Sequence, residues 1–198
     1  MKILRTMALV FGLSVAAEMA TAVTIDFESM ATGTYSALAF ADGTITYTGG
    51  DTLFDVVSAS PGPPVSGHAL LSYYTNAGAA PFRVDFTLAN ITFFQIGVGD
   101  YNQDEDNTHL AVYDAFGNLL GSDFYLNPSS TNGGDYLSVA TSTPIAYALF
   151  WDAEPFAGAV YWDNMTYTAG DPVPEPASLA LLASGLGLLA ARRRRTRP

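Results

Sequence analysis

The chain has 198 residues and no cysteine, which excludes thiol catalysis, cysteine-ligated zinc and disulfide bonds and suggests a single domain. It carries 19 acidic and 8 basic residues. Between 23 and 191, Arg83 stands alone against 18 carboxylates, a net charge of −17. A field of that sign excludes nucleic acid as a partner of this region and attracts divalent cations.

The first 22 residues have the three parts of a secretory signal peptide. Lys2 and Arg5 form the basic start, residues 7–17 form a short apolar run, and small residues at 20–22 fit signal-peptidase cleavage. A membrane anchor or a buried first helix is the alternative, but the run is too short and Glu18 interrupts its flank. We therefore predict an N-terminal signal helix, cleaved by signal peptidase to leave a mature chain that begins near Val23.

Residues 23–170 are predicted to form one all-β domain. The candidate strands cover residues 23–28, 44–48, 53–57, 69–74, 82–88, 91–99, 109–114, 121–126, 135–141, 145–151 and 160–168. Apolar residues alternate along them, and Gly-, Pro- and Asn-rich turn signals separate them, while sustained helical periodicity is absent. About eleven short strands with this spacing indicate an antiparallel β-sandwich, most simply a jelly roll.

Residues 99–122 are the most distinctive internal stretch. A polar loop is predicted over 100–107, followed by a hairpin that turns at 115–118. This strand–turn–strand pattern resembles a hairpin common in carbohydrate-binding jelly rolls, which implies a fold like that of a carbohydrate-binding module and leaves function open.

Two groups of acidic residues are candidate calcium sites. Asp100, Asn102, Asp104 and Asp106 offer an oxygen ligand at every second position, although the EF-hand pattern fails at Glu105, where that loop requires glycine. A solvated acidic loop is the simpler interpretation. The resemblance to calcium-containing carbohydrate jelly rolls implies a second site, because an early acid and a late Asp commonly hold one structural Ca²⁺ there. Its residues would be Asp26 and Glu28 near the first strand, with Asp163 and Asn164 in the last.

Exposed aromatic residues are the candidate glycan-binding groups. Tyr74 and Tyr101 lie beside predicted turns and are our candidates for stacking on sugar rings, with Trp151 a further platform. Trp162 is predicted to fill the core. Because no basic groove accompanies them, an anionic polysaccharide would bind only through calcium bridges.

The sequence gives no positive sign of catalysis. His68 and His109 could each act as a base, but no G-x-S-x-G nucleophile elbow occurs, so we interpret both as surface histidines. With 18 carboxylates, some pair at a glycosidase spacing is expected by chance. We therefore predict a protein that is not an enzyme.

Residues 171–198 have the features of a short, temporary membrane anchor. Residues 177–191 are uncharged, and as a helix they would be ~22 Å long, shorter than a hydrocarbon core of ~30 Å. Four arginines follow, Arg192, Arg193, Arg194 and Arg195, and these would keep the C-terminus cytoplasmic. Pro174 and Pro176 hold Glu175 in an extended segment before the apolar run. A buried core helix and a glycosylphosphatidylinositol signal fit the arginine cluster poorly.

The order of Val173-Pro174-Glu175-Pro176, the apolar run and the arginine cluster resembles the PEP-CTERM sorting domain. Many proteins with this sorting domain also contain, in the domain that precedes it, hairpins like the one at 108–126. The resemblance implies recognition by an exosortase, a short transmembrane helix held transiently in the inner membrane, and a Gram-negative producer of exopolysaccharide.

These features together predict three regions: a signal peptide at 1–22, a β-sandwich at 23–170 and a sorting signal at 171–198. We expect an exported protein of the cell surface or extracellular matrix, with a structural or glycan-associated role and exopolysaccharide as a partner. The alternatives are a secreted glycan hydrolase on a jelly-roll scaffold and a matrix component that only associates with itself.

Overall fold

The computed structural model describes residues 21–72, 80–101, 104–128, 134–153 and 160–169, and within these ranges every regular element is a strand. The strands are β1 Ala22–Ile25, β2 Gly33–Tyr35, β3 Ala37–Phe40, β4 Gly43–Tyr47, β5 Phe54–Gly62, β6 Val65–Ser72, β7 Phe82–Phe86, β8 Ile91–Asp100, β9 Asp106–Tyr113, β10 Leu119–Asn127, β11 Gly134–Ile145, β12 Tyr147–Asp152 and β13 Val160–Ala169. The predicted signal helix and C-terminal helix fall outside the described residues. Inside them, no helix is long and apolar enough to cross a membrane.

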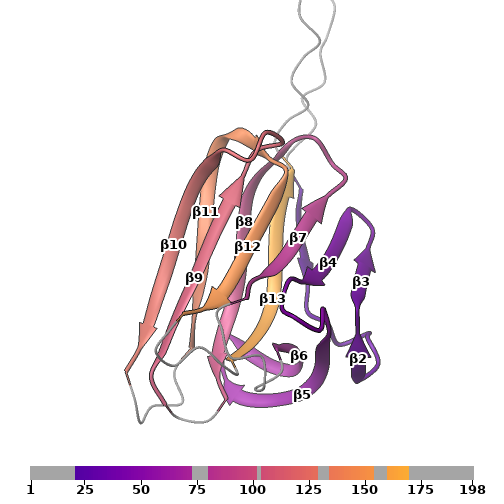
Figure 1. The fold of residues 1–198 in the computed structure, drawn as a ribbon, viewed down its shortest axis with the longest axis vertical. Helices are drawn as coiled ribbons and strands as arrows, with labels where there is room; N and C mark the ends of the chain where they lie inside the picture. The colour runs from indigo at the N-terminus through magenta and orange to yellow at the C-terminus, as the bar shows by residue number, and fades with distance from the viewer. Residues whose placement is uncertain (1–20, 73–79, 102–103, 129–133, 154–159, 170–198) are drawn as a thin grey trace, which may run out of the picture.

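The strands form two antiparallel sheets that pack face to face (Figure 1). One sheet has the order β11-β8-β13-β6-β5-β2, and β1 also pairs with β13; the other has the order β10-β9-β12-β7-β4-β3. An all-β antiparallel sandwich was the fold predicted from the alternating sequence, and the structure confirms it.

The strand order confirms the jelly roll as well. From β6 onward successive strands change sheets, except for the β9–β10 hairpin, which gives β6-β13-β8-β11 facing β7-β12-β9-β10. That is the order of an eight-stranded jelly roll built from two Greek keys. Of the earlier strands, β5 and β2 extend one sheet beyond β6, β4 and β3 extend the other beyond β7, and β1 pairs with β13. Of these, β2 and β3 were not predicted, because they are only three and four residues long.

The core consists of the inward-facing alternate residues of both sheets. Phe82 and Phe150 stack with their ring centroids 5.2 Å apart, and Phe150 lies 4.8 Å from Trp162. Trp162 is 1% exposed, which confirms its predicted place in the core. Burying large aromatic side chains between two sheets gives a disulfide-free domain its main source of stability.

The two ends of the sandwich differ in the residues that the strands place there. At one end, which we call the terminal end, Ala22 pairs with Thr168 and Ala169 pairs with Ile91, so both ends of the described chain lie there. At the other end, which we call the acidic end, β8, β9, β10 and β12 carry polar residues. These are Asp100, Asp106, Asn127 and Asp152. Since β8 spans the sandwich with ten residues, the two ends are ~30 Å apart.

Candidate functional site

The outer face of the six-stranded sheet presents a group of uncharged side chains. On β10, β9 and β12 alternate residues point away from the core. They are Ser122, Phe124 and Leu126; Asn107, His109, Ala111 and Tyr113; and Tyr147, Leu149 and Trp151. We call these ten residues the aromatic face. None of them is acidic or carries a permanent positive charge, although the chain around them is strongly acidic.

Three rings on this face form a row across neighbouring strands. The strand register aligns Phe124 of β10 with His109 of β9, and His109 with Trp151 of β12. The ring centroids of His109 and Trp151 are 5.2 Å apart at an interplanar angle of 14°, and those of His109 and Phe124 are 6.2 Å apart at 27°. Phe124 is 67% exposed, so the row continues to the edge of the sheet as an apolar ridge.

A second aromatic pair closes the other side of the aromatic face. Tyr113 and Tyr147 stack at 4.8 Å with an interplanar angle of 9°. The guanidinium carbon of Arg83 lies 3.8 Å from the centre of the Tyr147 ring, and its nitrogens donate to both carboxylate oxygens of Asp85 at 2.6 and 2.8 Å. The one arginine of the sandwich is therefore held by a ring and a carboxylate.

His109 does not add charge to the aromatic face at neutral pH. Burial lowers the pKa of His109 from its ordinary value of 6.5, because desolvation disfavours the imidazolium. The face therefore offers aromatic rings together with a few neutral hydrogen-bonding groups, from His109, Asn107 and the Trp151 indole. Such a surface suits an uncharged ligand that has both apolar faces and hydroxyl groups.

The acidic end brings together carboxylates that are separate in the sequence. Ligand oxygens of Asp100, Asp104 and Asp106 all lie within 4.8 Å of one another. The Asn127 amide donates to Asp100 at 3.1 Å and to Asp106 at 3.3 Å, and Asp152 accepts from the backbone N–H of Asn107 at 2.8 Å. Asp100 and Asp106 are 4% and 3% exposed, so the interpretation of these two as part of a solvated loop is wrong.

Strand pairing explains why these acids are buried. The predicted loop was too long, because Asp100 ends β8 while Asp106 and Asn107 already belong to β9. Burial raises the pKa of Asp106 to about 7. The Asn127 hydrogen bond opposes this rise, and the neighbouring charges of Asp152, Asp100 and Asp104 add to it.

In the larger sheet, the strand paired with one side of β13 changes from β6 to β1. Three acidic residues lie near this change of partner, which we call the division of the larger sheet: Asp26, Glu28 and Asp163. β13 pairs with β6 through Tyr161 and Trp162 and with β1 from Met165 onward, and a bulge separates the two pairings. Asp163, the last paired residue before the bulge, is 1% exposed, whereas Asp26 and Glu28 are exposed. The three acids are neighbours, since the charges of Glu28 and Asp26 help to raise the pKa of Asp163 to about 6, after burial as the main cause.

The carboxylates at this division already accept internal hydrogen bonds. Asp163 accepts from the backbone N–H of Ser66 at 3.1 Å and from that of Asn164 at 2.6 Å. Glu28 accepts from the backbone N–H of His68 at 3.0 Å. These bonds join β6, β13 and the segment that follows β1, where the ladder between strands is interrupted. A structural role therefore accounts for these residues without an ion.

The residues proposed for sugar stacking have different positions. Tyr74 lies outside the described residues. Tyr101 is 49% exposed, and its ring meets the edge of Tyr161 at 5.3 Å, beside the acidic end. His68 and His109 are partly buried rather than fully exposed, and the Nδ1 atom of His68 is buried without a hydrogen-bond partner.

Sequence reasoning did not single out Phe124 and His109 as members of one row. Each strand showed which residues alternate, but the register that aligns Phe124, His109 and Trp151 joins three strands. The available signal was the hairpin at 108–126, whose turn fixes how its two strands align.

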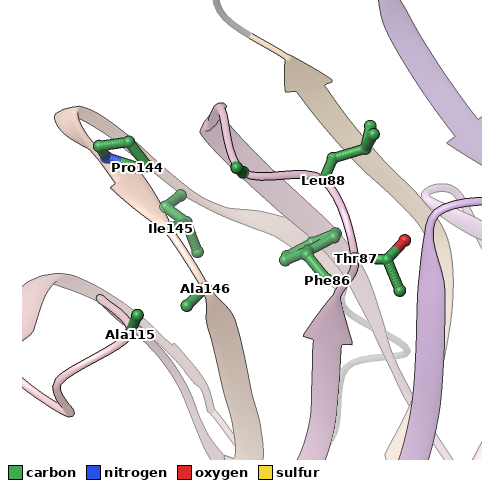
Figure 2. A pocket seen from close by; sticks show the side chains of 8 residues that line it. Phe86, Thr87, Leu88, Ala115, Pro144, Ile145 and Ala146 are labelled. Carbon is green, nitrogen blue, oxygen red and sulfur yellow. The ribbon is translucent and has the colours of Figure 1, made fainter.

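The terminal end contains an apolar pocket of about 280 Å³ (Figure 2). Three separate turns border it: one contributes Ala115, another contributes Pro144, Ile145 and Ala146, and the third contributes Phe86, Thr87, Leu88 and Ala89. None of the lining side chains is titratable, so acid–base chemistry has no group to act through there.

Comparison with known proteins identifies one family motif and several similar folds. A PEP-CTERM protein-sorting motif matches residues 172–195, and no curated protein matches the chain. The K2 cleaved adhesin domain of Lys-gingipain is 14% identical, with a TM-score of 0.51 over 75% of this chain and 98% of that domain. A family 29 carbohydrate-binding module is 12% identical, with a TM-score of 0.43 over 77% of this chain and 91% of the module.

An arabinose-bound MgGH51 α-L-arabinofuranosidase is also similar, at 6% identity and a TM-score of 0.47 over 72% of this chain. The chain spans only a quarter of the length of that enzyme. At these identities the adhesin-domain similarity shows a shared β-sandwich fold, while the sorting motif is a direct sequence match. The chain carries a PEP-CTERM protein-sorting motif at residues 172–195, behind a jelly-roll β-sandwich body.

Proposed function

We propose that this is an exported, non-enzymatic protein of the cell surface or exopolysaccharide matrix, whose sandwich binds a neutral polysaccharide through the aromatic face. The sorting motif implies export and transient membrane anchoring before exosortase processing. One observation carries the binding role. The ten residues of the aromatic face, on three strands, include no acidic side chain and no permanent positive charge, although residues 23–191 have a net charge of −17.

The chemistry of the aromatic face favours a neutral glycan over an anionic one. Sugar rings have apolar C–H faces that pack against aromatic side chains, and their hydroxyls bind neutral donors and acceptors. Phe124 and Trp151 supply aromatic surface, while His109 and Asn107 supply hydrogen bonds. A polyanion would be repelled by the surrounding carboxylates, because Arg83 is already paired with Asp85.

A glycan array tests the proposal on residues 23–170, and affinity electrophoresis in polysaccharide-containing gels measures the affinity. Trp151→Ala and Phe124→Ala should each weaken binding on the order of tenfold, which corresponds to about 1.4 kcal/mol. Tyr136→Ala is the matched control, because Tyr136 is a 44% exposed aromatic residue on the edge strand β11 of the other sheet. Equal losses for Tyr136→Ala and Trp151→Ala, or no binding to any neutral glycan, would contradict the proposal.

Calcium in this proposal is a structural ion at Asp100, Asp104 and Asp106. Their oxygens are close enough to share one Ca²⁺ with ligand distances of ~2.3–2.6 Å. Asp26, Glu28 and Asp163 are the second possible set, but backbone N–H groups already occupy oxygens of Glu28 and Asp163.

A calcium titration followed by thermal unfolding separates the two sets. Asp104→Asn should abolish a rise in unfolding temperature on calcium addition, whereas Glu28→Gln should preserve it. If instead Glu28→Gln abolishes the rise and Asp104→Asn preserves it, the ion belongs to the set of Asp26, Glu28 and Asp163. An unchanged unfolding temperature of the unaltered protein at millimolar calcium would remove calcium from the proposal.

A further inference from the structure

The terminal end of the sandwich exposes apolar side chains around a pocket. Phe116, at the tip of the β9–β10 hairpin, is 91% exposed, and Leu119 beside it is 58% exposed. Ala115, Pro144 and Ala89 are also exposed and surround the apolar pocket (Figure 2). Large apolar side chains exposed together at the tips of loops mark an interaction site.

The same end lies close to the point where the chain leaves the sandwich toward its sorting tail. The last residue of β13, Ala169, pairs with Ile91 of β8, and Ile91 pairs with Ile145 of β11, which lines the pocket. Ala169 is therefore in register with the pocket, two strands away. In Figure 1 the turns β7–β8, β9–β10 and β11–β12 lie at one end of the sandwich, together with the end of β13.

The distance from this end to the membrane is limited by the length of the chain. Seven residues, 170–176, separate Ala169 from the uncharged run that starts at Ala177. Fully extended, seven residues reach at most ~25 Å, which is less than the length of the sandwich. While residues 177–191 are in the bilayer, the terminal end is thus held near the lipid surface at a high effective concentration, and a weak contact suffices.

Charge also separates the two ends. Asp100, Asp104, Asp106 and Asp152 gather at the acidic end, on the far side of the sandwich. At the terminal end three carboxylates already have partners. Asp114 accepts hydrogen bonds from the backbone of Phe116 and Asn118 inside its own turn, Asp42 accepts from the Tyr167 hydroxyl, and Asp85 is paired with Arg83. The acidic end is therefore directed away from the anchor, and the apolar end toward it.

We infer that, before the tail is cleaved, the terminal end rests on the outer surface of the anchoring membrane, with Phe116 entering the lipid interface. The occupant is a zwitterionic lipid surface, since the acidic sandwich repels both anionic lipids and a second copy of itself. This contact orients the aromatic face sideways and the acidic end outward. The inference rests on the tail anchoring proposed above and concerns a surface that glycan binding does not use.

The test uses the full chain reconstituted by its tail into phosphatidylcholine vesicles. Because the protein has no cysteine, Phe116→Cys and the control Tyr136→Cys each accept one environment-sensitive fluorophore. We expect a blue shift and a severalfold rise in emission at position 116 on reconstitution, with quenching by spin-labelled lipids, and no such change at position 136. Adding phosphatidylglycerol should weaken the change at 116.

A second measurement avoids the bias of a label at the contact itself. With the fluorophore at 136, energy transfer to an acceptor at the lipid surface reports how the sandwich is oriented. Phe116→Leu should leave the transfer unchanged, and Phe116→Ser should alter it, because only leucine preserves an apolar tip.

Three results would overturn the inference. These are equal responses at 116 and 136, a response at 116 that grows with protein density and so reports self-association, and a response in the lipid-free protein. If the chain fails to float with the vesicles, the anchoring proposal itself fails. If it floats while position 116 remains in water, only the membrane contact is wrong.

Discussion

At the scale of single residues, Asp106 and Asp163 are the carboxyl groups whose burial has a thermodynamic consequence. Burial raises the pKa of Asp106 to about 7 and that of Asp163 to about 6, from an ordinary value of 3.8. A carboxyl with a raised folded-state pKa holds its proton more tightly when folded. It therefore favours folding at low pH, and this contribution is lost as the pH rises through the folded pKa.

For Asp106, the free energy of unfolding should fall between about pH 4 and pH 7, in calcium-free buffer, by up to ~1.4 kcal/mol per pH unit. Asp106→Asn should flatten this slope and stabilise the protein at pH 7.5 on the order of 1–2 kcal/mol, because a neutral amide replaces a buried charge. Urea unfolding across pH 4–8 measures both quantities.

The control for this experiment is Asp114→Asn. The pKa of Asp114 is lowered by hydrogen bonds from Asn118, so its titration lies below the tested window. Because Asp163 also titrates in this range, a slope in Asp106→Asn as steep as in the unaltered protein, or one that disappears equally in Asp114→Asn, would show that Asp106 does not cause it.

A second prediction at the residue scale concerns the backbone conformation of Gly67. Its φ is +81°, and a Cβ atom there would overlap the Glu28 carboxylate. Gly67→Ala should lower the free energy of unfolding by ~1–3 kcal/mol, because alanine is strained at this φ and Glu28 must move. Gly50→Ala is the matched control, since no atom lies within 4 Å of the added methyl group. Equal denaturation midpoints for the two variants would contradict this role of Gly67.

At the scale of elements, the edge strands β10 and β11 are joined by one side chain. Asp123 of β10 accepts a hydrogen bond from the backbone N–H of its neighbour Phe124 at 2.9 Å and from that of Ser138 of β11 at 2.8 Å. Two N–H groups on the edges of different sheets are thereby satisfied. Free edge groups are templates for pairing with another chain, so Asp123 protects both sheets from edge-to-edge association.

Asp123→Ala should therefore increase self-association, because it frees the N–H groups of Phe124 and Ser138 beside an exposed aromatic ring. Sedimentation velocity at several protein concentrations should show dimers or larger species that the unaltered protein lacks. Ser122→Ala is the control, as the neighbouring residue on the outer face. A monomeric Asp123→Ala protein of unchanged stability would mean that the hydrogen bonds to Asp123 are dispensable.

At the scale of the whole molecule, the aromatic face, the acidic end and the terminal end occupy different parts of the sandwich. The aromatic face covers the side of the sandwich, the carboxylates gather at one end, and the chain leaves toward its tail at the other. Because of this separation, cleavage of the tail would leave the proposed glycan site unaltered.

The sorting motif predicts how the mature protein should end. If an exosortase processes the tail near Pro174, Glu175 and Pro176, as the motif implies, protein recovered from the envelope of the producing organism should lack the arginines at 192–195. Mass spectrometry of its C-terminal peptide measures this, with an exosortase-deficient strain as the control. An intact arginine terminus in both strains would exclude processing.

The sequence by itself determined the features that depend on neighbouring residues. The PEP motif, the apolar run and the arginine cluster are contiguous, and the period-2 alternation of the strands is local, so the sorting tail and the jelly-roll sandwich were both predictable. The short strands β2 and β3 have too few residues to show a period.

Only the tertiary structure decided which side chains meet. Phe124, His109 and Trp151 lie on three strands, and the sequence could not supply the register that aligns them. The burial of Asp100 and Asp106 likewise depends on four strand ends converging at one end of the sandwich. The physical reason is that alternation fixes the face on which a side chain lies, whereas hydrogen bonding between distant strands fixes its neighbours.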